Sequence, residues 1–211
     1  MRPLRSATLL LVLAAVLGAG AIARADETIA VLGDSLTAGL GVAPDEAYPA
    51  LLQERLRREG YDYRVVNAGV SGDTTAGGLR RVDWVLRARP SVVIVALGAN
   101  DGLRGLSVAA MRRNLEQIVE RLRAAGARVL LVGMRVPPNY GAPYGHEFAA
   151  AFPAVARKMG VPLMPFLLDG VAGDAGLNQP DGIHPTAKGH AIIAERVWPY
   201  LKPLLRKSPP R

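Results

Sequence analysis

The chain of 211 residues has the length of one ordinary domain and can bury a substantial hydrophobic core. Half of its residues are hydrophobic but only 5% are aromatic, which favours helices packed on a β-sheet over a β-sandwich. The absence of cysteine excludes disulfides, a thiol nucleophile and a lipid-modified cysteine anchor. The net charge of +8 comes from basic residues scattered along helical segments near acidic ones, which favours solvated helix faces over a nucleic-acid surface.

Residues 1–25 have the features of a cleaved signal peptide. Arg2 and Arg5 form a basic start, an apolar run covers 7–23, and Ala23-Arg24-Ala25 has the small-x-small pattern that signal peptidase cuts. The alternative is an uncleaved membrane anchor, but the apolar run is short for a membrane span. We therefore predict a protein exported to the periplasm or secreted, without stable membrane insertion after cleavage. Loss of the three arginines leaves 23 basic and 18 acidic residues, a net charge of +5.

Strand-like and helix-like segments alternate along the rest of the chain. The expected strands cover 28–33, 63–67, 91–97, 128–133 and 161–166. The expected helices follow Ser35 and then cover 48–58, 77–89, 108–125, 147–158 and 187–205, with a Pro/Gly/Tyr-rich loop at 137–145. This alternation predicts one α/β domain over residues 26–206, with a five-stranded parallel sheet between two helical layers and a disordered tail at 207–211.

Glycine-containing turns follow the first three expected strands, at 33–35, 68–75 and 98–102. The carboxyl ends of parallel strands meet at one edge of a sheet, where open α/β sheets place their chemistry. Ser35 is expected in the first turn of a helix, where free N–H groups and the helix dipole favour a developing oxyanion. The alternative is that Asp34 or Ser35 only caps that helix.

A short turn near the end of the chain, 180–185, contains Asp181 and His184. An aspartate three residues before a histidine can accept the imidazole Nδ1–H and leave Nε2 free to face a hydroxyl. Neither of the other two histidines, His146 and His190, has an adjacent aspartate. An ordinary surface or capping role is the alternative, but a candidate nucleophile at Ser35 favours a catalytic triad.

Such a nucleophile needs hydrogen-bond donors for the tetrahedral oxyanion. The candidates are the N–H of Ser35, the N–H of Gly72 and the side-chain amide of Asn100. Gly72 could instead be a plain turn glycine, and Asn100 could form an Asx-turn. Their shared position at successive strand ends makes coincidence the weaker interpretation.

Four sequence blocks, in this order, resemble the SGNH (GDSL) hydrolase family: Gly33-Asp34-Ser35-Leu36, Gly72, Gly98-Ala99-Asn100-Asp101 and Asp181-Gly182-Ile183-His184-Pro185. The resemblance implies a flavodoxin-like fold with Ser35 as nucleophile, His184 as base and Asp181 as its partner. It also implies Gly72 and Asn100 as oxyanion donors beside the Ser35 N–H, and a structural role for Asp34. Residues 67–74, 98–105, 137–141 and 161–163 resemble the exported bacterial acyl thioesterase, lysophospholipase and arylesterase branch.

We therefore predict a serine esterase that hydrolyses aryl esters, acyl esters, acyl thioesters or lysophospholipids through an acyl-enzyme. An apolar wall for the acyl or aryl group is expected from Leu103, Pro137, Pro138 and Tyr140, although each could serve stability alone. No cofactor or metal is expected, because no cofactor fingerprint appears and no two histidines stand at ligand spacing with a carboxylate.

Two other functions are compatible with parts of the sequence. A carbohydrate acetylesterase of the same family would share every catalytic residue. A flavodoxin-like module that binds a nucleotide or phosphate would share the glycine turns but has no use for Asp181 with His184. The partner is thus expected to be a small-molecule ester or thioester, and the sequence leaves the oligomeric state open.

Overall fold

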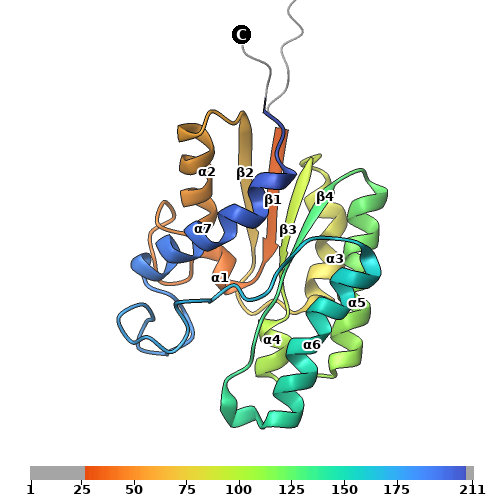
Figure 1. The fold of residues 1–211 in the computed structure, drawn as a ribbon, viewed down its shortest axis with the longest axis vertical. Coiled ribbons are helices and arrows are strands. Elements are labelled where there is room, and N and C mark those ends of the chain that lie inside the picture. The colour runs from red at the N-terminus through yellow and green to blue at the C-terminus, as the bar shows by residue number, and fades with distance from the viewer. Residues whose placement is uncertain (1–26, 208–211) are drawn as a thin grey trace, which may run out of the picture.

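A computed structural model describes residues 27–207, and Figure 1 shows its central sheet between two groups of helices. Five parallel strands lie in the order β2-β1-β3-β4-β5. Their bounds are β1 Glu27–Gly33, β2 Tyr63–Gly69, β3 Val92–Ala96, β4 Arg128–Val132 and β5 Leu163–Met164. This is the flavodoxin-like strand order. The predicted α/β fold with a five-stranded parallel sheet is confirmed.

Helices cover both faces of the sheet. The helical elements are α1 Ser35–Ala38, α2 Tyr48–Arg58, α3 Thr75–Leu86, α4 Ala99–Leu103, α5 Val108–Ala124, α6 Ala142–Met159 and α7 Ala187–Leu201, with short 3₁₀ turns at Pro138–Tyr140 and Lys202–Leu204. Helices α2 and α7 pack together on one face, while α3, α5 and α6 form the layer on the other (Figure 1). None of the helices in this part of the chain combines the length and apolarity needed to cross a bilayer.

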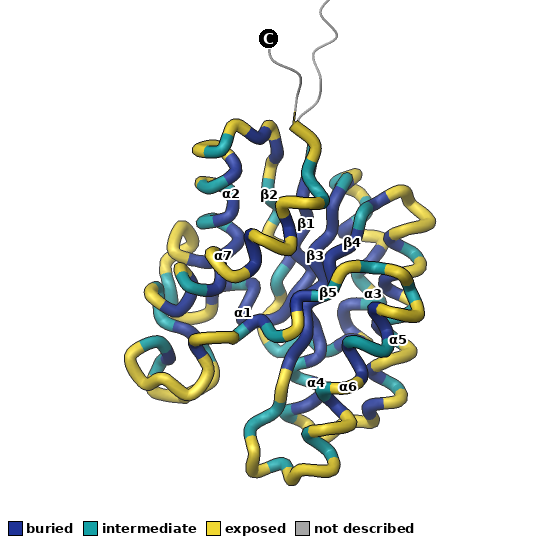
Figure 2. The backbone as a smooth tube through the Cα atoms, in the orientation of Figure 1, coloured by how far each residue is buried: buried dark blue, intermediate teal, exposed yellow. Residues whose placement is uncertain are grey.

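The central strand carries the core. Every residue of β3 is buried, as its continuous Val/Ile run predicts for a strand covered on both faces. Figure 2 shows the buried backbone concentrated in the sheet, with exposed segments in the outer turns and loops. The loops that follow the strands are therefore anchored at the carboxyl edge of a buried sheet.

Several element boundaries differ from the predicted ones. The turn at 98–102 closes into the short helix α4, and α6 begins at Ala142 inside the segment expected to be a loop. Helix α3 begins earlier than expected because the Thr74 hydroxyl caps it, accepting the Gly77 N–H. Strand β5 has only two residues, because prolines at 162 and 165 flank it and cannot donate to a sheet ladder.

The predicted signal peptide at 1–25 lies outside the described residues, as does the part of the predicted tail from 208 to 211. Within the described residues, the carboxyl ends of β1, β2 and β3 align, since Gly33 pairs with both Gly69 and Ala96. The three glycine-containing turns therefore start from the same edge of the sheet. This edge carries the candidate site.

Candidate active site

The turn between β1 and α1 places Ser35 in the first turn of a helix. Asp34 is the N-cap of α1, and its carboxylate accepts the Leu36 N–H at 3.0 Å. A side chain at Gly33 would put its Cβ only 1.9 Å from Thr37 Oγ1, so this close turn requires glycine. The Ser35 N–H is consequently one of the free donors at the helix start.

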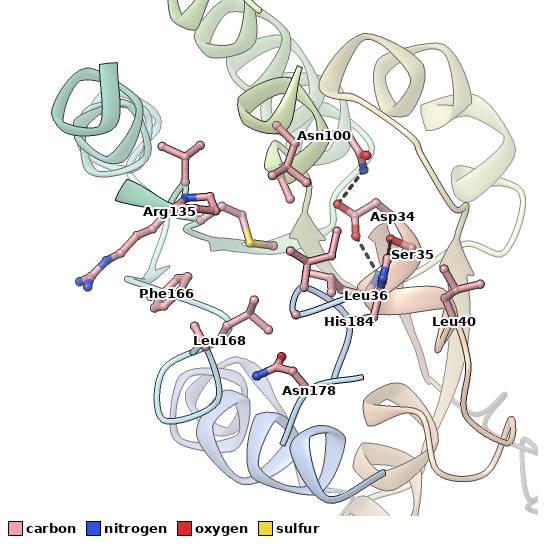
Figure 3. A pocket seen from close by; sticks show the side chains of 18 of the residues that line it. Asp34, Ser35, Leu36, Leu40, Asn100, Arg135, Phe166, Leu168, Asn178 and His184 are labelled. Carbon is pink, nitrogen blue, oxygen red and sulfur yellow. Dashed lines mark hydrogen bonds between the residues drawn. The ribbon is translucent and has the colours of Figure 1, made fainter. Parts of the chain in front are cut away.

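Ser35, His184 and Asp181 are hydrogen-bonded in line, and Figure 3 shows Ser35 beside His184. Ser35 Oγ lies 2.9 Å from His184 Nε2, and His184 Nδ1 lies 2.7 Å from Asp181 Oδ2. The hydrogen bond from His184, followed by those from the backbone N–H groups of Ile183 and His184, lowers the pKa of Asp181 to about 2. Asp181 is therefore ionised at neutral pH and accepts the Nδ1–H. The free lone pair of the neutral ring is then on Nε2, facing Ser35.

The loop that carries His184 is tied to two other segments. The Gln179 N–H donates to the His184 carbonyl at 2.7 Å, and Asn178 forms an antiparallel bridge with Pro185. The Gln179 side chain donates to the Leu40 carbonyl at 2.7 Å and to the Pro185 carbonyl at 3.0 Å. These contacts join the loop to the segment after α1 and fix the imidazole beside the serine.

The three residues expected to supply oxyanion donors, Ser35, Gly72 and Asn100, all line one pocket. Gly72 has a φ of +77°, which favours glycine, and its N–H has no backbone acceptor among the described residues. Asn100 Nδ2 donates to the Asp73 carbonyl at 3.0 Å and to Asp34 Oδ2 at 3.4 Å. The structure thus brings Ser35, Gly72 and Asn100 to the same side of the nucleophile turn.

Asp34 is fully buried directly beneath the serine. Burial raises the pKa of Asp34 to about 6, although the hydrogen bond from the Leu36 N–H opposes this effect. The carboxyl group holds α1 through that hydrogen bond and contacts Asn100 on its other oxygen. These contacts suit the structural role that the sequence resemblance implies.

Arg81 binds the ends of the strands that lead into the site. Sequence reasoning missed this role because it assigned Arg81 to a solvated helix face. Its guanidinium donates to the carbonyls of Gly33 and Ala68 at 3.2 and 3.0 Å, and to the Asp73 carboxylate at 2.9 Å. The side chain is only 22% exposed. It satisfies carbonyl groups at the ends of β1 and β2 and neutralises Asp73. Nothing in its sequence neighbourhood distinguishes it from other helical arginines.

A pocket of about 600 Å³ opens beside the serine (Figure 3). Of the residues expected in its wall, Leu103, Pro137 and Pro138 line it. Tyr140 does not line it, contrary to expectation, because its hydroxyl points to the Leu103 carbonyl and donates to it at 2.7 Å. Sequence reasoning missed further apolar wall residues: Leu36, Leu40, Met134, Val136, Phe166, Leu168 and Ile183.

Within residues 27–207, no three histidine or carboxylate side chains form a group that could hold a metal ion. The polar groups at the carboxyl edge are instead arranged in line from carboxylate to imidazole to hydroxyl. On a parallel α/β sheet, this is the arrangement of a serine hydrolase.

Residues 31–192 match the model of the GDSL-like Lipase/Acylhydrolase family, and the chain belongs to that family. The chain is 49% identical to Esterase TesA of Pseudomonas aeruginosa, over 86% of this chain and 90% of the relative. It is 40% identical to Thioesterase 1/protease 1/lysophospholipase L1 of Escherichia coli K12, over 87% of each chain. The family assignment made from the four sequence blocks is confirmed.

Solved structures show the same fold. The crystal structure of TesA superimposes with a TM-score of 0.83 and covers 85% of this chain and 100% of that chain. The psychrotrophic esterase EstA from Pseudoalteromonas sp. is 37% identical, has a TM-score of 0.80, and covers 84% of this chain and 98% of that chain.

Proposed function

We propose that the protein hydrolyses carboxylic esters and thioesters through an acyl-enzyme formed on Ser35. The observation that carries this proposal is the 2.9 Å hydrogen bond between Ser35 Oγ and His184 Nε2 at the floor of an apolar pocket. Membership of an acylhydrolase family and similarity to proteins named esterase, arylesterase and thioesterase support the same chemistry.

In the first half-reaction, His184 Nε2 accepts the proton of Ser35 as Oγ attacks the substrate carbonyl. Asp181 holds the ring through Nδ1 and stabilises the imidazolium. The oxyanion receives hydrogen bonds from the N–H groups of Ser35 and Gly72 and from the Asn100 amide. His184 then gives its proton to the leaving alcohol or thiol.

In the second half-reaction, His184 accepts a proton from water, which attacks the acyl-enzyme and releases the acid.

The Asn100 amide has two hydrogens, and in the free protein they contact Asp73 and Asp34. The contact to Asp34 is the longer of the two, at 3.4 Å. An oxyanion would replace this weaker contact while the 3.0 Å bond to the Asp73 carbonyl keeps the amide in position.

The pocket supports acyl or aryl esters over small acetyl groups. Its volume of about 600 Å³ and its apolar wall suit a chain or ring better than an acetyl group alone. This favours the esterase over the carbohydrate acetylesterase that the family also allows.

The EstA relative was crystallised inhibited by monoethylphosphonate, an organophosphorus compound that fits a serine hydrolase mechanism in that protein.

The site would act in the periplasm or outside the cell. The basic start, the apolar run and the cleavage pattern of residues 1–25 support export of a single mature domain covering 26–206. Detection of a mature N-terminus at Asp26 would test this part of the proposal, and an intact N-terminus on the exported protein would contradict it.

The decisive assay is hydrolysis of p-nitrophenyl esters of increasing chain length, with acyl thioesters and acetylated sugars beside them. Ser35→Ala should lower kcat by at least about 10⁴-fold, because no other group takes over the attack. Ser71→Ala is the matched control, since Ser71 lines the same pocket but has no histidine partner among the described residues. Turnover by Ser35→Ala close to that of the wild type would overturn the proposal.

A further inference from the structure

One polar side chain in the pocket wall has an atom without a partner. Asn178 is only 6% exposed and lines the pocket. Its amide nitrogen donates to the Val171 carbonyl at 2.7 Å and to the Asp174 carbonyl at 2.8 Å. Its amide oxygen is buried and accepts no hydrogen bond within the described part of the chain. A buried acceptor left unpaired costs about 1–3 kcal/mol, so this oxygen calls for a donor.

The two carbonyl groups fix which end of the amide is the oxygen. Turning the amide over would place Oδ1 against the carbonyls of Val171 and Asp174 and would lose both hydrogen bonds. The nitrogen therefore faces the segment 171–174, and the oxygen faces away from it. Figure 3 shows the oxygen directed toward the open pocket, with Asn178 on the opposite side of the pocket from Asn100.

The surroundings of this oxygen select the kind of donor that would reach it. The neighbouring wall is apolar, with Leu36, Phe166 and Leu168 on the same pocket. An ammonium group would lose its hydration there, and the carboxyl group that lines the pocket, Asp34, is already engaged by Leu36 and Asn100. A hydroxyl group needs only one acceptor. The oxygen is buried in the free protein, so a side chain of the pocket wall has to move before a ligand can reach it.

We propose that Asn178 Oδ1 accepts a hydrogen bond from a hydroxyl group of the substrate and makes the enzyme prefer hydroxylated esters over plain ones. This inference rests on the ester hydrolysis proposed above and specifies its substrate class. The hydroxyl can belong to the acyl chain or to the alcohol part, as in a glycerol monoester. In both cases an otherwise apolar substrate would satisfy this buried acceptor.

The test compares matched substrates on the same enzyme preparation. In the first arm, kcat/KM is measured for the p-nitrophenyl ester of a fatty acid and for esters of the same acid hydroxylated at successive carbons. In the second arm, a glycerol monoester is compared with the propyl ester of the same acid. We expect the hydroxylated substrate to be favoured about tenfold in one arm, the equivalent of one net hydrogen bond.

Asn178→Leu should reduce that preference to about unity, since it removes the acceptor but keeps the side-chain volume close. Asn139→Leu is the matched control, because Asn139 is exposed and is not among the residues that line the pocket. A general loss of folded protein lowers the apparent kcat/KM for the hydroxylated and the plain substrate alike and leaves their ratio unchanged. A change in the ratio therefore reports the loss of the acceptor. If the variant fails to fold, the wild-type ratios alone decide.

Wild-type ratios near unity in both arms would overturn the proposal, as would a hydroxyl preference that survives in Asn178→Leu. In either case hydrolysis of the plain esters would still support the proposed function. Failure of all esters in both arms would instead refute the ester hydrolysis itself.

Discussion

Asp101 accepts two hydrogen bonds from Thr75, one from its N–H at 2.8 Å and one from its hydroxyl at 2.6 Å. Both residues are buried. Asp101 directly follows Asn100 in α4, and Thr75 begins α3 just after the turn that contains Gly72. The pair therefore joins the two segments that carry the proposed oxyanion donors Gly72 and Asn100.

Asp101→Ala should misalign these donors. We expect kcat to fall by about tenfold or more with KM little changed, because the oxyanion forms only in the transition state. Thr75→Val, which removes the hydroxyl but keeps the shape, should lower kcat less. A double-mutant cycle should show that the two effects are not additive. Additive effects, or a change confined to KM, would contradict a role in alignment.

Asn100→Ala tests the proposed oxyanion donor directly. Loss of one donor should raise the barrier by on the order of 3 kcal/mol, which lowers kcat about 10²–10³-fold and leaves KM nearly unchanged. Asn139→Ala, at an exposed asparagine outside the pocket wall, is the matched control. Normal kcat in Asn100→Ala would assign the asparagine to turn structure alone.

Asp34→Asn should reveal the titration of the buried carboxyl group. Burial raises the pKa of Asp34 from 3.8 to about 6, so the folded state binds more protons than the unfolded state between these values. This contribution to stability is present at low pH and is lost as pH rises to about 6, by roughly 3 kcal/mol. Urea unfolding of wild type and variant at a series of pH values measures the difference. Parallel pH profiles would contradict the raised pKa.

The same variant separates two sources of acid inactivation. Protonated His184 cannot accept the serine proton, so activity should fall at acid pH. Asp181 remains ionised in this range, because its pKa is about 2. If His184 causes this fall, the activity of Asp34→Asn should fall at acid pH as that of the wild type does. Activity of Asp34→Asn that does not fall at acid pH would assign the loss to Asp34 instead.

His190 should act on stability in the opposite direction. This residue of α7 is fully buried, and its Nδ1 accepts the Tyr48 N–H at 3.3 Å. Its Nε2 has no partner among the described residues. Burial lowers the pKa of His190 to about 4, against the influence of Glu46. Its contribution is present above the unfolded pKa of 6.5 and is lost as pH falls to about 4, by on the order of 3 kcal/mol.

His190→Gln keeps an acceptor for the Tyr48 N–H and removes the titration. The variant should therefore lose less stability than the wild type between about pH 6.5 and pH 4, as measured by urea unfolding. In the wild type, the His190 and Asp34 contributions oppose each other over this range, so the two variants should deviate in opposite directions. Equal acid sensitivity in wild type and His190→Gln would contradict the lowered pKa.

The strands and the four family sequence blocks could be recognised because their signals are local. The Val/Ile run of β3 indicates a strand covered on both faces, and the spacing of Asp181 and His184 indicates one rigid turn. Helix α4 was missed because Gly98 and Gly102 indicate a turn, although the segment closes one helical turn. The early start of α6 follows from Pro143 in its first turn, where a missing N–H costs nothing.

The pocket wall could be predicted only in part because it is assembled from segments distant in sequence. Met134 follows β4, and Phe166 and Leu168 follow β5, and only the sheet order brings these ends together beside Ser35. Arg81 and Asn178 were missed for the same reason, since their roles depend on carbonyl groups that the fold delivers.

The central claim is that Ser35, activated by His184, forms the covalent intermediate. Its most direct test is the intact mass of the protein after reaction with a p-nitrophenyl alkylphosphonate, followed by peptide mapping of the adduct. We predict a single adduct on the peptide that contains Ser35, no adduct in Ser35→Ala and a much slower reaction in His184→Ala. An adduct at another residue, or labelling of Ser35→Ala at the wild-type rate, would contradict this account.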